Sequence, residues 1–421
     1  MKALALIDGE HYAPVVRDAL VELPYDFAAA YLVGGTEKLR GGEDYGVPLV
    51  DDLEAAIREL APEAIVDLSD EPVLGPRERF RFASLALARG VPYVGADFRF
   101  EPPVFEPFEL PSIGIVGTGK RVGKTAVAGH AARLYARDRR VLVVAMGRGG
   151  PPEPEIAEAG TSLGRLLELS RNGRHAASDY LEDAVLAGVE TIGCRRAGGG
   201  LAGATMTDNV AEGARLAAES GADLVLFEGS GAALPPVATG RRVLVADAST
   251  DVELLTGYLN AYRILISDLI VLTNAEDGAP AAAREAIADV KALPIVATVM
   301  RPRPAASIAG RRVAFFTTAP EHAHERLAEH VRAEHGAEVA HVSGNLGRRD
   351  ALREELKAID AETYLVEIKA AAIDVVAEAA AARGVECVFV DNEVRPVPGG
   401  LDLDTELLAL AEAAAGQPVA G

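Results

Sequence analysis

The feature that most constrains this chain is a regular alternation of short apolar runs with longer segments of helical periodicity. Residues 3–7, 64–68 and 269–273 have the length and composition of buried strands, whereas residues 53–60 and 124–138 have the spacing of amphipathic helices. Strands that alternate with helices in this way form parallel sheets with helices packed on their faces. The sequence therefore predicts an α/β protein.

Two proline-rich segments interrupt the pattern and divide the chain. Residues 101–111 contain four prolines, and Arg301-Pro302-Arg303-Pro304 repeats the signal. Proline lacks a backbone N–H and has a fixed φ, so such segments interrupt regular structure. We therefore expect a smaller N-terminal α/β domain at residues 1–105, a second domain at 106–300 and a C-terminal α/β region at 301–421. This last region is either a third domain or an extension of the second sheet.

The charge of the chain limits its partners. Acidic residues outnumber basic residues by 63 to 42, which gives a net charge of −21. Such a surface repels nucleic acid and anionic membranes, so we expect neither as a partner, and an anionic ligand requires a local basic pocket. Cys194 and Cys387 are too few for a disulfide framework, and no apolar stretch has the roughly 18 residues of a membrane span. These features indicate a cytoplasmic protein.

The most informative motif is Gly117-Thr118-Gly119-Lys120-Arg121-Val122-Gly123-Lys124-Thr125, which lies between a predicted strand and the predicted helix at 124–138. Glycines let backbone N–H groups turn toward one point, and the amino terminus of the helix adds positive potential. This segment is therefore typical of a phosphate-binding loop. In such a loop Lys124 reaches the β- and γ-phosphates of a nucleotide, and the Thr125 hydroxyl binds Mg²⁺.

The loop departs from the usual spacing. Five residues instead of four separate Gly117 from Gly123, and Thr118 occupies the usual first-glycine position, so a longer loop variant is implied. The alternative is an ordinary glycine turn with a surface Lys-Thr pair. We expect Lys120 to act with Lys124 in catalysis. The expected nucleotide-binding residues are Gly117, Thr118, Gly119, Arg121, Val122, Gly123, Lys124 and Thr125.

A candidate metal ligand follows a later predicted strand, at residues 224–227. This strand ends in Glu228-Gly229-Ser230-Gly231. A carboxylate at the carboxyl end of a neighbouring parallel strand is suited to bind Mg²⁺ opposite a phosphate loop. The alternative is a solvent-facing glutamate before a turn. Because the loop is present as well, we predict that Glu228 and Thr125 share a metal site.

Several cations near predicted strand ends are candidates for binding an anionic substrate. Arg148 follows a strand whose carboxyl end lies at the ligand-binding edge of an open α/β sheet, so it ranks first outside the loop and is also a catalytic candidate. Arg195 and Arg196 precede Gly198-Gly199-Gly200 and either cradle a phosphate or are mobile surface residues. Lys38 is a further substrate-binding candidate.

Polar residues also gather at strand ends in the N-terminal domain. Asp8, Glu10 and His11 follow the first strand, and Asp70 and Glu71 follow another. A carboxylate pair beside a histidine can bind a metal or hold arginines in place, and the alternative is a turn of solvated residues. We hypothesise that Asp8 and His11 bind substrate in a cleft that closes between this domain and the phosphate loop.

Asn274 has two interpretations. It follows the predicted strand at 269–273, where its amide can hydrogen-bond the edge of a nucleotide base. Asparagine at a strand end also stabilises turns. We retain Asn274 as a candidate cofactor-binding residue.

The phosphate loop and the Glu-Gly-Ser-Gly segment together resemble the dethiobiotin synthetase group of P-loop enzymes. The group transfers a phosphoryl group from ATP to an acid, which then closes a ring. Where the group has a carboxylate-rich loop, this chain has Lys120 and Arg121. Two added cations imply a substrate with more negative charge than a carbamate or a simple carboxylate.

A closer resemblance extends over more of the chain. The phosphate loop and four earlier segments are similar to the cyclic 2,3-diphosphoglycerate synthetase family, namely residues 6–12 (LIDGEHY), 34–38 (GGTEK), 67–72 (DLSDEP) and 95–98 (GADF). The resemblance implies an ATP- and Mg²⁺-dependent closure of 2,3-diphosphoglycerate, a small anionic substrate, into its cyclic phosphoanhydride, with release of ADP and phosphate. It also implies catalysis by positioning and charge stabilisation, with no general-base histidine.

Two other functions would use the same loop. One is a dethiobiotin-synthetase-like or cobyrinate-amidase-like ATP enzyme that acts on a small carboxylate. The other is a P-loop switch ATPase or GTPase. Partitioning ATPases carry a lysine five residues before the loop lysine, where this chain has Gly119, which argues against the switch. Because phosphate loops of this type often work in dimers, a homodimer is considered as well.

Overall fold

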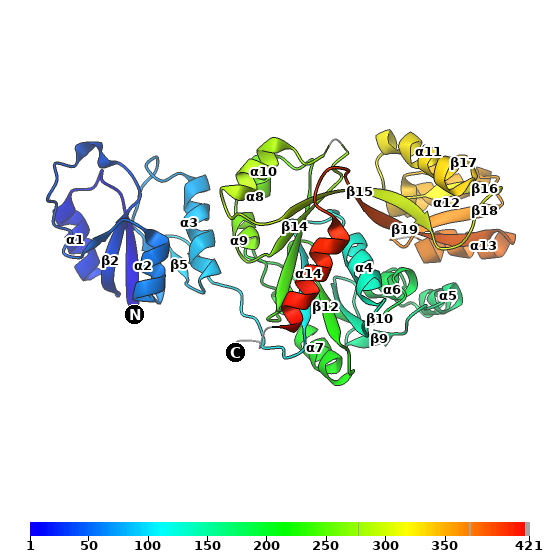
Figure 1. The fold of residues 1–421 in the computed structure, drawn as a ribbon, viewed down its shortest axis with the longest axis horizontal. Helices are drawn as coiled ribbons and strands as arrows, with labels where there is room; N and C mark the ends of the chain where they lie inside the picture. Colours follow the sequence, from blue (N-terminus) through cyan, green and yellow to red (C-terminus); the bar gives the residue numbers. More distant parts are fainter. Residues whose placement is uncertain (277, 370–371, 417–421) are drawn as a thin grey trace.

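The computed structural model describes residues 1–276, 278–369 and 372–416, except for the side chain of Lys38. An N-terminal domain, a central domain and a C-terminal region lie in a row along the long axis of the molecule (Figure 1). Parallel strands alternate with helices in each part, so the predicted α/β fold is confirmed.

The N-terminal domain is built on a six-stranded sheet. Its strands are β1 (Lys2–Ile7), β2 (Asp26–Leu32), β3 (Leu49–Val50), β4 (Ala64–Asp67), β5 (Tyr93–Val94) and β6 (Arg99–Phe100), and its helices are α1 (Ala13–Glu22), α2 (Leu53–Leu60) and α3 (Pro76–Ala88). The strand order is β3-β2-β1-β4-β5-β6, and only the β5–β6 pair is antiparallel. Residues 3–7 of β1 are fully buried, which explains why this run is uniformly apolar.

The central domain contains the phosphate loop and a longer parallel sheet. Its strands are β7 (Ser112–Gly117), β8 (Val141–Gly147), β9 (Glu155–Ala157), β10 (Glu190–Ala197), β11 (Thr207–Asp208), β12 (Leu224–Glu228), β13 (Arg241–Asp247), β14 (Leu269–Thr273) and β15 (Ile295–Pro304). The strands β10-β8-β12-β7-β13-β14-β15 are parallel neighbours in that order. Their carboxyl ends therefore lie at one edge of the sheet, where ligands bind in open α/β folds.

Helices cover both faces of this sheet. They are α4 (Lys124–Tyr135), α5 (Leu163–Arg171), α6 (Asp179–Leu186), α7 (Val210–Glu219), α8 (Val252–Thr256), α9 (Asn260–Leu265) and α10 (Ala281–Ala288). Side chains alternate along a strand, so Ile115 of β7 belongs to the same core as α4, and Val116 to the same core as α9. No helix in the described ranges combines the length and the apolar character needed to cross a membrane.

The C-terminal region extends the same sheet, which decides between the two arrangements considered from the sequence. Its strands are β16 (Arg312–Phe316), β17 (Glu338–Ser343), β18 (Thr363–Glu367) and β19 (Glu386–Pro396), and its helices include α11 (His324–His335), α12 (Arg349–Ala358) and α13 (Glu378–Arg383). The first part of β15 pairs with β14, and its second part pairs with β19 in antiparallel register. The last helix, α14 (Leu403–Ala415), returns to pack against β7, β13 and α4 of the central domain.

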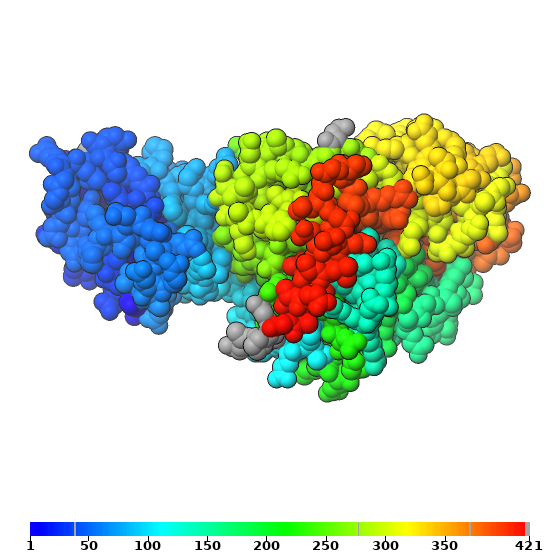
Figure 2. All heavy atoms as spheres, viewed as in Figure 1, coloured from blue at the N-terminus to red at the C-terminus, as the bar shows by residue number. Residues whose placement is uncertain are grey.

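The N-terminal domain is attached to the central domain through α3. This helix packs against α9, and Phe80 of α3 makes an edge-on ring contact with Tyr258. Leu87 of α3 shares one buried cluster with Leu259 and Tyr262 of the central domain. Figure 2 shows the blue N-terminal domain joined to the central domain on the side of α8, α9 and α10.

Candidate active site

The phosphate loop is held in place by two neighbouring strands. Thr118 N donates a hydrogen bond to Val245 O of β13 (3.1 Å), and Thr273 Oγ1 of β14 donates to Val122 O (2.9 Å). Gly123 has φ +86°, and a Cβ at this position would lie 2.0 Å from Met300 Cε. The positive φ favours glycine here, whereas Met300 Cε is the end of a flexible side chain that can shift. The loop is thus a rigid turn between β7 and α4.

Lys124 lies along the inside of its own loop. It is the first residue of α4 and only 8% exposed, and its Nζ donates to Gly119 O (3.1 Å). A Cβ at Gly117 would lie 2.8 Å from Lys124 Cδ, so the glycine gives the lysine side chain its room. Burial lowers the pKa of Lys124, and the charges of Glu228 and Asp179 oppose that shift. An ammonium group is therefore held at the amino terminus of a helix, where phosphates bind.

Glu228 ends β12 directly opposite the loop. Thr125 Oγ1 donates to Glu228 Oε1 (2.7 Å), and Glu228 is 1% exposed. The second carboxylate oxygen, Oε2, is buried without a hydrogen-bond partner. Burial, together with the charge of Asp179, raises the pKa of Glu228 to about 8. The solvent-facing alternative is therefore wrong. Glu228 is a buried carboxylate, and one of its two oxygens has no hydrogen-bond partner.

Two of the predicted arginines meet at the turn after β12. A Cβ at Gly231 would lie 3.1 Å from Arg148 Nη2 and 3.4 Å from Arg196 Nη2. Arg196 also donates to Ser230 O (2.7 Å) and Gly198 O (2.6 Å), so it is not a mobile surface residue. The charge of Arg148 acts on Lys124 as well as on Arg196. These two guanidiniums lie beside the loop at the carboxyl edge of the sheet.

Arg195 lies differently from its neighbour Arg196. Both belong to β10, and successive side chains of a strand point to opposite faces. Arg195 is anchored through its backbone N–H, which donates to Asn209 Oδ1 (2.7 Å), and its side chain is exposed. The structure therefore brings Arg196 to Arg148 without placing Arg195 there.

Asn274 and the two loop cations complete the set predicted near the nucleotide. Asn274 has φ +54°, and its Nδ2 donates to Asp247 Oδ2 (2.7 Å), so the amide takes part in the turn after β14. Lys120 and Arg121 are exposed on the outer side of the loop. Arg121 has φ +66° and lines a cavity that extends toward the C-terminal region. Base recognition by Asn274 stays a prediction.

The N-terminal cluster forms a compact turn. Asp8 is fully buried and accepts hydrogen bonds from the backbone N–H groups of Glu10, His11 and Asp70 (3.0, 3.2 and 2.8 Å), while His11 Nδ1 lies 2.8 Å from Asp8 Oδ1. The charges that act on Lys124 come from the central domain and the C-terminal region. The structure does not join Asp8 and His11 to the phosphate loop, and the side chain of Lys38 lies outside the described residues.

Comparison with known proteins assigns the chain to a family. Three family models match it: the cyclic 2,3-diphosphoglycerate synthetase N-terminal domain over residues 2–101, the P-loop domain over 112–308 and the C-terminal domain over 304–393. The cyclic 2,3-diphosphoglycerate synthetase of Rubrobacter xylanophilus is 50% identical, with 98% of each chain covered, and that of Thermococcus gammatolerans is 43% identical, with 94% of each covered. The chain belongs to the cyclic 2,3-diphosphoglycerate synthetase family. The family resemblance seen in the sequence is therefore confirmed.

A relative from Methanothermus fervidus, also named cyclic 2,3-diphosphoglycerate synthetase, is 39% identical over 93% of this chain and 92% of its own. Among solved structures, LpxK from Aquifex aeolicus in complex with ATP is 13% identical, with a TM-score of 0.45, over 74% of this chain and 90% of that one.

This member of the cyclic 2,3-diphosphoglycerate synthetase family has three acids near the loop that sequence analysis missed, and Glu182 and Asp183 among them are buried. Asp179, Glu182 and Asp183 come from α6, and Asp183 Oδ2 is buried without a partner. Burial raises the pKa of Glu182 to about 7 and also raises that of Asp183. The sequence pattern that could have revealed them is the spacing i, i+3 and i+4 of these three acids in an otherwise apolar helix. This spacing places them on one face of the helix.

The C-terminal region of this synthetase-family chain also reaches the loop. Lys369 Nζ, just after β18, donates to Glu182 Oε2 of α6 (2.5 Å). Burial alone would lower the pKa of Lys369, but the charges of Glu182 and Asp179 outweigh burial and raise it. The same ammonium acts on Lys124. Residues more than one hundred positions apart in the sequence therefore share one charged centre.

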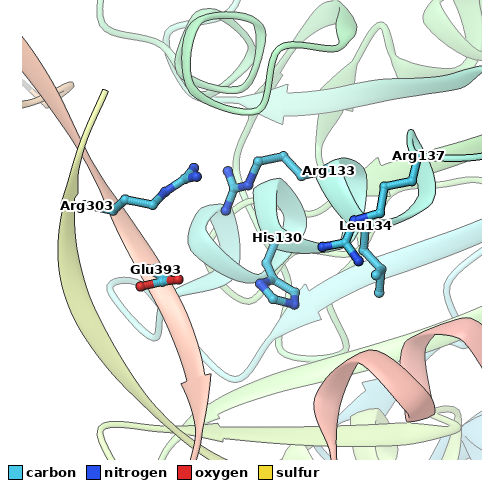
Figure 3. Close-up of a pocket in the computed structure, with 6 residues that line it drawn as sticks. All are labelled: His130, Arg133, Leu134, Arg137, Arg303 and Glu393. Atoms are coloured by element: carbon cyan, nitrogen blue, oxygen red, sulfur yellow. The ribbon is translucent and has the colours of Figure 1, made fainter. Parts of the chain in front are cut away.

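A separate cavity lies on the side of α4 (Figure 3). Its volume is about 310 Å³, and it is lined by His130, Arg133, Leu134, Arg137, Arg303 and Glu393. Arg133 and Arg303 each pair with Asp391 of β19 (2.8 and 2.9 Å), and Asp391 is 7% exposed. This group braces the helix of the phosphate loop against β15 and β19.

Proposed function

We propose that the chain catalyses the ATP-dependent closure of 2,3-diphosphoglycerate into cyclic 2,3-diphosphoglycerate, releasing ADP and phosphate. The observation that carries the proposal is the buried Lys124–Thr125–Glu228 arrangement at the phosphate loop, in a chain of this family. The relatives from Rubrobacter xylanophilus and Thermococcus gammatolerans, which cover nearly the whole chain, carry the name of this synthetase.

The residues at the loop fit Mg²⁺. The Thr125 hydroxyl and the Glu228 carboxylate are the hard oxygen donors that Mg²⁺ prefers, and Glu228 Oε2 has no partner within the described residues. Bound there, Mg²⁺ would neutralise charge on the terminal phosphates of ATP. Asp183, with its own unpartnered oxygen, lies close enough for the charge of Glu228 to raise its pKa.

The proposed reaction has two steps that balance. One phosphate oxygen of the substrate attacks the γ-phosphorus of ATP, which forms a P–O bond and releases ADP. An oxygen of the second substrate phosphate then attacks the inner phosphorus of this new diphosphate, closes the ring and releases inorganic phosphate. Both steps bring anions together, so the protein must offset their repulsion.

The cations of the site are placed for that task. Lys124 lies inside the loop to receive the phosphates of ATP, and Arg148 and Arg196 converge beside it at Gly231. Because Lys124 is held by burial and Arg196 by hydrogen bonds, these two cations stabilise charge without reorganising during the reaction. A histidine is not needed as a general base, since phosphate oxygens are already ionised at neutral pH.

The proposal is tested by replacing Lys124. Lys124→Ala is expected to lower kcat by about 10²- to 10³-fold, because one preorganised cation at the transferred phosphate is lost. Purified protein is incubated with ATP, Mg²⁺ and 2,3-diphosphoglycerate, and phosphorus NMR follows the phosphoanhydride signal. Lys357→Ala is the matched control, because Lys357 is exposed on α12 and pairs with Glu354 on the same helix. ATP consumption by the unmodified protein without a ring product would reject the proposed function.

A further inference from the structure

The ligand-binding edges of the two halves of the long sheet face one another. β15 continues past the central sheet, and its residues 298–304 pair antiparallel with residues 396–390 of β19. β18 runs parallel to β19, β16 to β18, and β17 to β16. The carboxyl ends of β16, β17 and β18 therefore point back toward the carboxyl edge that carries the phosphate loop. In open α/β sheets such edges bind ligands.

A cavity of about 470 Å³ lies between these two edges, a size suited to a small ligand. The phosphate loop contributes Arg121. The other lining residues come from the end of β17, the segments after β16 and β17, the start of α11, and α12. They include Thr318, His324, Asn345 and Arg348, together with the exposed carboxylate of Glu321. We call this space the Arg121–Arg348 cavity. It joins the loop to the C-terminal region, and its lining residues, among those that the structure describes, all come from these two parts.

The two arginines of the cavity have no protein partner for their charge. Neither the Arg121 nor the Arg348 guanidinium makes a hydrogen bond or ion pair within residues 1–276, 278–369 and 372–416 that the structure describes. Both side chains are exposed and open to a ligand, whereas arginines such as Arg301 and Arg353 pair with acids. Arg121 also has φ +66°, which is unfavourable for a residue with a Cβ. Strain of this kind is typical of a residue held in place for a ligand.

The floor of the cavity is held by Glu355. This carboxylate accepts hydrogen bonds from Ser343 Oγ (2.5 Å) and Asn345 Nδ2 (2.9 Å), and His341 Nε2 lies 2.7 Å from it. Its charge is therefore already engaged. Asn345 is fixed in one orientation by this contact, and its Oδ1 is buried without a partner.

We propose that the Arg121–Arg348 cavity binds the acceptor substrate, a small acid that carries phosphate groups. One anionic group of the acceptor lies between the two guanidiniums, and the group to be phosphorylated lies on the loop side, toward Lys124. This inference rests on the proposed function. It assigns acceptor binding to the loop and the C-terminal region, whereas the sequence analysis predicted substrate-binding residues in the N-terminal domain and in the central domain.

The experiment measures acceptor and nucleotide binding separately. Arg348→Ala is expected to raise the KM for 2,3-diphosphoglycerate by about tenfold or more, because a charge-assisted hydrogen bond is lost, while the KM for ATP changes less than about twofold. Arg353→Ala, in α12 just after Arg348 and paired with Asp350, is the matched control and should leave both constants unchanged. Arg348→Lys should restore part of the affinity, since the charge is kept without the bidentate geometry.

A second variant covers the loop side of the cavity. Arg121→Asn keeps a residue that tolerates positive φ, and it should also raise the KM for 2,3-diphosphoglycerate. Circular dichroism and ATP affinity report whether each variant is folded. The cavity assignment would be overturned if folded Arg348→Ala had an unchanged KM for 2,3-diphosphoglycerate, or if its KM for ATP rose equally. Ring formation by the unmodified protein would still support the proposed function in either case. If His11→Ala raises the KM for 2,3-diphosphoglycerate and Arg348→Ala does not, the acceptor binds at the N-terminal domain instead.

Discussion

Glu228 is a buried carboxylate whose charge is only partly balanced by Thr125 and Lys124. Its pKa is raised to about 8, well above that of an exposed glutamate, so the folded protein without metal binds a proton that the unfolded chain releases near pH 4.5. Between about pH 4.5 and pH 8 the folded state therefore holds more protons. The free energy of unfolding falls as pH rises through this window.

The Glu228→Gln substitution tests this linkage. Glutamine mimics the protonated acid and can still accept the Thr125 hydrogen bond, so the fall in stability between pH 5 and pH 8 should be roughly 2 kcal/mol smaller than in the unmodified protein. Urea denaturation with a chelator present measures it. Glu182 and Asp183 also have raised pKa values, so a residual fall is expected. Exposed Glu354→Gln should keep the original slope, and an equal slope in Glu228→Gln would contradict the pKa shift.

Sequence analysis predicted single site residues correctly where a recognisable motif lies at the end of a predicted strand. Glu228 was predicted from the rule that ligands gather at the carboxyl ends of parallel strands, and the structure places it 2.7 Å from Thr125. Arg195 and Arg196 could not be separated, because a shift of one residue in a strand reverses which side chain faces the site. Asp183 and Lys369 carried no motif, and their contacts cross large distances in sequence.

The helix that follows the loop is fixed at its carboxyl half by an ion-pair group. Asp391 of β19 accepts from Arg133 of α4 and from Arg303 of β15. Asp391→Asn would leave both guanidiniums without their charge partner. Because Asp391 is buried but Arg303 is partly exposed, we expect a loss of roughly 2 to 3 kcal/mol in the free energy of unfolding, measured by urea denaturation.

The matched control for this element is Asp350→Asn. Asp350 is fully exposed and pairs with Arg353 on the surface of α12, so its loss should cost less than about 0.5 kcal/mol. If both variants lose the same small amount, the Asp391 group does not brace α4. The sequence could not reveal this group, because the antiparallel pairing that places Asp391 of β19 opposite Arg303 of β15 is not predictable from periodicity.

The arrangement of the whole molecule follows from one strand, β15, which joins the two halves of the long sheet. Apolar runs predicted the strands on either side of it, but the direction of the C-terminal strands depends on the antiparallel β15–β19 pairing. That direction turns the C-terminal region back toward the phosphate loop. The N-terminal domain, by contrast, is attached through α3 on the side of α9. Alternating strands and helices predict layers, but they do not predict which domain faces the loop.

The ion pair between Lys369 and Glu182 connects the C-terminal region to α6 of the central domain, so we expect it to contribute to the free energy of unfolding. Lys369→Met leaves Glu182 buried without its cation, and because the Lys369 side chain is 33% exposed we expect a loss of roughly 2 kcal/mol in the free energy of unfolding. Glu182→Leu combined with Lys369→Met removes both charges and should recover most of that loss. A double-mutant cycle by urea denaturation should therefore give a coupling of about 1 to 3 kcal/mol. Zero coupling would mean that the C-terminal region is held against the loop by the sheet alone.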